Sequence, residues 1–160
     1  PPAQPPLLIR DAAARRVISD WPMASIRTAE AIMEKYGPPD LALKEWLAWF
    51  DNGPWLMTKV YRDPREHLDV LEQTIRYRVP QDKRMALAKL DVALRLSRDN
   101  RELSATSESE ETNMLALNLA DEVVREKKSP EEARELYLKA VVQWNAGRST
   151  PYMKELLFRR

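Results

Sequence analysis

The spacing of apolar residues predicts two helices at the start of the chain. Between Leu7 and Ile18, and again between Ser25 and Tyr36, apolar residues recur every three or four positions, which is the period of one helix face. Pro22 separates the two segments, and Ser25 is placed to cap the second helix. Gly37, which is followed by proline, ends that helix.

The pattern then changes to the alternation that is typical of strands. Segments 44–50 and 55–62 are rich in aromatic residues and flank the turn sequence Asp-Asn-Gly-Pro at 51–54, which predicts a hairpin. Segment 70–79 places Leu71 and the alternate residues after it on one side and charged residues on the other. This arrangement predicts an antiparallel strand with one face in solvent.

The last third of the chain predicts a second hairpin and three helices. A short helix follows Pro80, and strands at 92–97 and 103–106 turn at 98–100. Ser107 and Glu110 fit a capping box for a helix that continues to Val124. The sequence Ser-Pro-Glu-Glu at 129–132 begins the final helix, which ends at Gly147.

Helices, then antiparallel strands, then helices indicate an α+β fold with a meander sheet of about four strands, covered by helices on one face. A chain of 160 residues fits one domain, which we place at residues 8–150. An extended proline-rich tail at 1–7 and a basic C-terminal tail at 151–160 are expected to flank it.

Composition removes several kinds of chemistry from consideration. The chain has no cysteine, one histidine (His67) and three glycines, none of them close to another. Thiolate metal sites, cysteine nucleophiles and glycine-rich phosphate loops are therefore excluded, and we expect no catalytic residue, no cofactor and no metal. The net charge of +1 gives no reason to expect a nucleic-acid partner.

Aromatic residues give the stronger functional indication. Five tryptophans against two phenylalanines is a bias typical of interfaces, and three tryptophans gather around the predicted hairpin. Two interpretations stay open for them, packing in the core under the helices or a surface that binds a protein. The prolines near the N-terminus and the basic C-terminus are further candidate contacts. The candidate partner-binding residues are Pro5, Pro6, Trp46, Trp49, Trp55, Tyr152, Phe158, Arg159 and Arg160.

Seven short motifs carry a resemblance to a known family. They are YGPPD at 36–40, NGPW at 52–55, VYRD at 60–63, LEQ at 71–73, YRVP at 77–80, NMLALNLA at 113–120 and EEAR at 131–134. With this spacing the chain resembles a family of uncharacterised bacterial proteins over most of residues 20–155. The resemblance implies a fold and no activity.

The chain departs from that family's pattern at three places. The connection after Asp63 is shorter and leaves only His67 of a His-Asn-Phe-Pro run, a cysteine expected near Ser107 is absent, and Asp121 replaces a histidine. If those positions form a site in the family, its loss here favours a structural role.

A second similarity concerns the segment from Ala29 to Arg62. This helix, Gly-Pro-Pro-Asp and hairpin order is similar to that of small envelope lipoproteins that assist outer-membrane protein assembly. Together with the proline-rich start it favours a periplasmic or envelope location over the cytosol, although both stay open. No segment is long and apolar enough to predict a transmembrane helix.

The sequence therefore predicts a non-catalytic interaction module, an accessory subunit that docks on a larger protein assembly, which could be membrane-associated. The alternative is a small-molecule-binding protein or hydrolase with a pocket between sheet and helices. We expect Glu72, Arg76, His67 and Asn113 to line that pocket.

Overall fold

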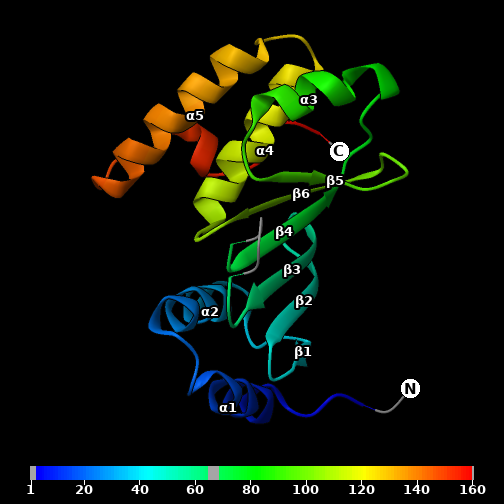
Figure 1. The fold of residues 1–160 in the computed structure, drawn as a ribbon. Coiled ribbons are helices and arrows are strands. Elements are labelled where there is room, and N and C mark those ends of the chain that lie inside the picture. Colours follow the sequence, from blue (N-terminus) through cyan, green and yellow to red (C-terminus); the bar gives the residue numbers. More distant parts are fainter. Residues whose placement is uncertain (1–2, 65–68, 160) are drawn as a thin grey trace.

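The computed structural model describes residues 3–64 and 69–159, and its first half contains two helices and four strands (Figure 1). In chain order these elements are α1 (Leu7–Ile18), α2 (Met23–Tyr36), β1 (Leu41–Ala42), β2 (Trp46–Asn52), β3 (Trp55–Tyr61) and β4 (Leu71–Arg76). The second half contains the 3₁₀ turn η1 (Gln81–Lys83), α3 (Arg84–Leu90), β5 (Leu94–Leu96), β6 (Glu102–Ser107), α4 (Glu110–Val124), α5 (Pro130–Asn145) and the 3₁₀ turn η2 (Pro151–Met153).

The predicted α+β class is confirmed, with a sheet larger than expected. Six antiparallel strands lie in the order β1-β2-β3-β4-β6-β5. Strand β1 was missed because two residues are too few to show an alternation. The sheet is not a simple meander, because β4 pairs with β6 and leaves the three-residue β5 at the edge.

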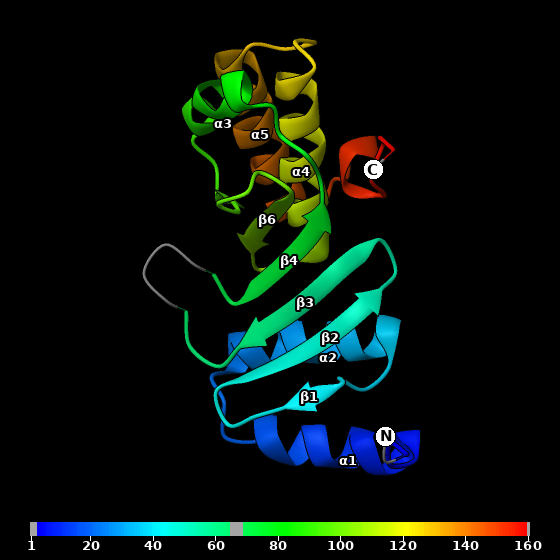
Figure 2. The ribbon, with the colours of Figure 1, turned by 90° about the vertical axis from the view of Figure 1, so that its right-hand side faces the viewer.

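One face of the sheet carries all the helices and both apolar clusters. Helices α1 and α2 cover the β2–β3 part, where Leu47, Trp49 and Val60 are buried. Helices α3, α4 and α5 gather over the other end, around Ile75 and Leu103. Figure 2 shows the two groups of helices at opposite ends of the sheet, with α2 behind β2 and β3. The helical layer is therefore divided, and the sheet connects its two parts.

The opposite face of β4 is not solvated, which corrects the expectation for that strand. Glu72 is 1% exposed and Thr74 is 6% exposed. The Tyr61 hydroxyl donates to Glu72 Oε1 at 3.0 Å, and Arg95 donates to Glu72 Oε2 at 2.5 Å. A charged residue at an alternate strand position thus lies in the interior because neighbouring strands supply its partners.

Two helix caps differ from the prediction. Helix α2 begins at Met23 with Pro22 at the cap position, and Ser25 lies inside the helix, where its hydroxyl donates to the Arg62 carbonyl at 2.6 Å. The cap of α4 is Ser109, which accepts from the Thr112 N–H at 3.2 Å, whereas Ser107 is the last residue of β6. The capping box at Ser129 and Glu132 is confirmed.

The C-terminal segment packs on the domain. The Asn118 side chain donates to the carbonyls of Tyr152 and Glu155 at 2.8 Å each and accepts from the Leu157 N–H at 2.8 Å. Met153 is 1% exposed. Residues 151–159, predicted as a tail, therefore lie fixed against α4.

Candidate functional site

A cleft of about 350 Å³ lies between α2 and the N-terminal end of α4. Helix α2 forms one wall, the N-terminal turn of α4 forms the other, and the start of β4 contributes Val70 and Leu71. Its charged lining residues are Arg27, Lys35, Asp69, Glu108, Glu110 and Glu111. A volume of this size is at the lower end of the range for small-molecule sites.

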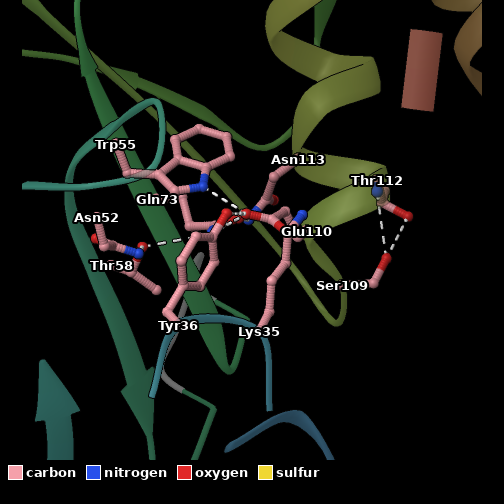
Figure 3. Close-up of polar contacts among 10 residues, drawn as sticks. All are labelled: Lys35, Tyr36, Asn52, Trp55, Thr58, Gln73, Ser109, Glu110, Thr112 and Asn113. Atoms are coloured by element: carbon pink, nitrogen blue, oxygen red, sulfur yellow. Dashed lines mark hydrogen bonds and ion pairs between the residues drawn. The ribbon is translucent and has the colours of Figure 1, made fainter. Parts of the chain in front are cut away.

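Glu110, the first residue of α4, lies at this cleft and accepts hydrogen bonds from four side chains (Figure 3). Lys35 Nζ donates to Oε2 at 2.5 Å. Trp55 Nε1 donates to Oε1 at 2.5 Å, Gln73 Nε2 donates to the same oxygen at 3.2 Å, and the Tyr36 hydroxyl does so too. We call these five residues the Glu110 network. It joins α2, β3, β4 and α4 at one carboxylate.

The network continues along the helix-covered face of the sheet by way of Gln73, which is fully buried. Asn113 Nδ2 donates to Gln73 Oε1 at 3.0 Å, and the Ser107 hydroxyl donates to Asn113 Oδ1 at 2.7 Å. Gln73 Nε2 also reaches Thr58 Oγ1 at 3.4 Å. Connected polar groups of this kind rigidify an interior when each has a partner.

The surroundings of Glu110 favour its ionised form. Burial alone would raise the pKa of its carboxyl, but the hydrogen bonds from Lys35, Tyr36 and Trp55 outweigh burial and hold the pKa below its ordinary value. Burial and the bond to Glu110 raise the pKa of the Tyr36 hydroxyl. A carboxylate with a lowered pKa and four donors is a poor general base, because catalysis needs a pKa near the working pH. The arrangement is that of a structural anchor.

The structure separates the three hairpin tryptophans, for which core packing and a protein-binding surface were both open interpretations. Trp49 and Trp55 are each 2% exposed, and their indole N–H groups donate inward, to the Gly37 carbonyl at 2.9 Å and to Glu110. Trp46 is half-buried, with Lys59 Nζ 4.7 Å from its ring centroid. Trp49 and Trp55 therefore belong to the core, and only Trp46 offers a ring to solvent.

The remaining candidate partner-binding residues lie at several places in the fold. Pro5 and Pro6 are exposed ahead of α1, and Arg159 is exposed at the other end of the chain. Tyr152 is half-buried, and its hydroxyl donates to Glu122 at 2.9 Å. Phe158 is half-buried against the ring of Tyr77, with centroids 5.3 Å apart. Arg160 lies outside the described residues.

Of the four residues predicted to line a pocket, the three that the structure describes do not share one site. Asn113 lies on the helix-covered face of the sheet, bonded to Gln73, whereas Glu72 and Arg76 are on the opposite side of the same strand. His67 lies outside the described residues. The pocket expected from these residues is therefore wrong, and the cleft between α2 and α4 is a different one.

Sequence reasoning missed the central residue of the site. Glu110 was interpreted only as part of a helix start, and nothing local marks it as buried. The available signal was indirect: Tyr36, Trp55, Gln73 and Asn113 all belong to the short motifs that carry the family resemblance. In the structure Tyr36, Trp55 and Gln73 donate to the Glu110 carboxylate, and Asn113 donates to Gln73, so these motif residues take part in holding the fold together.

Comparisons with known protein families, with curated proteins and with solved structures find no match to this chain. In the part of the chain that the structure describes, no group of three or more acidic or histidine side chains is arranged to hold a metal ion. None of the described helices has both the length and the apolar character needed to cross a bilayer.

Proposed function

We propose that this chain is a non-catalytic interaction module, an accessory subunit that docks on a larger protein assembly. The observation that carries the proposal is an apolar surface at the start of α1. Leu7, Leu8 and Ile9 are consecutive and are 64%, 82% and 56% exposed. Isolated exposed leucines are ordinary, but a run of three is the kind of feature that marks an interaction surface.

A fourth exposed apolar residue, Leu41, follows a segment that α1 contacts. Arg10 donates to the Pro39 carbonyl at 2.9 Å and to Asp40 at 3.1 Å, which fixes the first turn of α1 beside the start of β1. Leu41, which follows Asp40 in the chain, is 41% exposed. We call Leu7, Leu8, Ile9 and Leu41 the apolar tip. Burying one such side chain contributes about 1.5–3 kcal/mol of favourable free energy, so a partner gains affinity here from apolar contact alone.

Site-specific crosslinking tests the proposal in the source cell. A photo-crosslinking residue at Leu8 is expected to give one discrete adduct with another protein, and the same residue at the exposed Arg98 is expected to give none. The double variant Leu8→Asp, Ile9→Asp should keep the fold but no longer form the complex. Measurements of size in native extract should then show the monomer. A monomer in native extract, with no adduct from Leu8, would overturn the proposal.

A second candidate function rests on the cleft between α2 and α4. Its size and its mixed lining, apolar at Ala31 and Ile32 and charged at Lys35 and Glu111, suit a small polar ligand. A thermal-shift screen against metabolites would favour this function if one compound stabilises the chain by several degrees. Ala31→Trp, which fills the cleft from an exposed position of α2, should then cancel the shift.

A further inference from the structure

A second hollow, of about 700 Å³, lies between the turn that connects β2 to β3 and the C-terminal segment. Its described lining residues are Asp51, Gly53, Pro54, Trp55, Leu56, Arg76, Phe158 and Arg159. Three of the predicted partner contacts are thus brought to one place, because Trp55 lies beside Phe158 and Arg159, which are about a hundred positions later in the chain. We call this region the arginine hollow.

The C-terminal wall of the arginine hollow is held in position. Asn118 binds the backbone of residues 152, 155 and 157 with three hydrogen bonds of 2.8 Å. Phe158 then packs on the ring of Tyr77 in an edge-to-face arrangement, with an interplanar angle of 82°. Tyr77 follows Arg76 directly in the chain. These contacts place the C-terminal wall next to the end of β4.

The charges of the arginine hollow are not neutralised by the fold. Arg76 and Arg159 are exposed and have no carboxylate partner among the residues that the structure describes. Arg95 and Arg125, in contrast, are each paired with a buried carboxylate. Asp51 is the acidic residue in the described lining, so two positive side chains face one negative one. Guanidinium groups match carboxylates geometrically and can bind them with two hydrogen bonds.

The apolar lining residues limit the classes of ligand that the arginine hollow can bind. Pro54, Leu56 and Phe158 form a wall that a lone phosphate or carboxylate ion would not use, and the volume far exceeds that of such an ion. A nucleic acid is a poor match, because the whole chain carries a net charge of only +1 and nucleic-acid-binding domains are strongly basic. A peptide with both acidic and apolar side chains fits both parts of the lining.

We propose that the arginine hollow binds an acidic segment of a partner protein, with a carboxylate at Arg76 and Arg159 and an apolar side chain against Phe158. The inference rests on the proposed function, since it names the chemistry by which a docking partner is recognised. It concerns a different surface from the apolar tip, so the two can fail separately.

Fluorescence anisotropy with a labelled synthetic peptide tests the inference on the full chain. The probe is Glu-Phe-Glu-Glu-Phe-Glu, and its matched control replaces each glutamate with glutamine. We expect saturable binding of the acidic peptide that weakens from 50 to 500 mM salt, and weak or no binding of the control. Arg76→Ala and Arg159→Ala should each weaken binding roughly three- to tenfold, whereas Arg98→Ala, at an exposed arginine of the β5–β6 turn, should not.

Several outcomes would overturn the inference. They are equal binding of the glutamine peptide, no effect of either arginine variant, and displacement of the peptide by a single-stranded oligonucleotide at lower concentration than by unlabelled peptide. If Leu8 gives its crosslink and the acidic peptide does not bind, only the arginine hollow is refuted. If the peptide binds in solution but Leu8 gives no adduct and the chain is monomeric in extract, the proposed function is overturned, while the affinity of the arginine hollow for acidic peptides stands.

Discussion

Trp55 and Glu110 are joined by a hydrogen bond although 55 positions separate them in the chain. The indole comes from the first residue of β3 and the carboxylate from the first residue of α4, and both side chains are buried. Trp55 belongs to the apolar cluster around Ile75 and Leu103, and Tyr36, which bonds the same carboxylate, packs against both apolar clusters. The fold is thus held at its centre by polar contacts, with apolar packing on both sides.

We expect Glu110→Ala to be among the most destabilising substitutions in the chain. It leaves the donors of Lys35, Tyr36, Trp55 and Gln73 without their acceptor, and breaking a buried charged contact in this way costs about 3–5 kcal/mol. Urea unfolding would measure the loss in free energy of unfolding. Glu108→Ala, at an exposed carboxylate two residues earlier, is the control and should change it by less than about 0.5 kcal/mol. Equal effects of both variants would refute the structural role of Glu110.

The pH dependence of stability should carry the signature of the same carboxylate. The pKa of Glu110 is lower in the folded protein than in the unfolded chain, so its ionised form favours folding. That contribution is complete above the unfolded pKa, about 4.3, and is lost as the pH falls through the lower folded value. Lys35 is the charged neighbour that lowers the pKa of Glu110 in the fold, both by its hydrogen bond and by its charge.

Comparison of the native chain with Glu110→Gln isolates this contribution from those of other carboxyls, such as Asp99, whose pKa is also lowered. We expect the native chain to be more stable at pH 7 and the difference in free energy of unfolding to shrink below pH 4. A difference that stays constant from pH 7 to pH 3 would contradict the prediction.

The fold was largely predictable because it depends on local signals. The hairpin turn at 51–54, the capping box at Ser129 and the apolar periodicity of α1 and α5 each specify their element within a few residues. The predictions that failed concern features that depend on contacts between distant segments. Ser107 and Ser109 are both suitable caps for α4, and the choice follows from where β6 ends against β4.

The candidate site was much less predictable for the same reason. An alternation such as that of β4 shows which residues share a face, but not whether another element covers that face. Glu72 looked solvated because its partners, Tyr61 and Arg95, come from other strands. The hairpin tryptophans looked like a binding surface because their acceptors, the Gly37 carbonyl and Glu110, are outside the hairpin.

Gly53→Ala should be more destabilising than Gly147→Ala, although both glycines have positive φ values, +58° and +87°. A Cβ at Gly53 would lie 2.9 Å from Tyr36 Cε1 and 3.1 Å from its hydroxyl oxygen, so the ring that binds Glu110 must move. Gly147 has nothing within 4 Å and would suffer backbone strain alone, about 1–2 kcal/mol. Thermal unfolding of the two variants checks the order. A larger loss at Gly147 would show that Tyr36 adapts to the new methyl group at little cost.

Paired tryptophan substitutions test which ring supports the fold and which one is at the surface. Trp55→Phe removes buried ring volume and one donor to Glu110, which we expect to lower the free energy of unfolding by roughly 2–4 kcal/mol. Trp46→Phe changes a half-buried ring and weakens its contact with the Lys59 ammonium, worth about 0.5–1 kcal/mol. Urea unfolding followed by circular dichroism measures both without depending on tryptophan emission. If Trp55→Phe lowers the free energy of unfolding no more than Trp46→Phe does, the hydrogen bond between Trp55 and Glu110 does not hold the two groups of helices together.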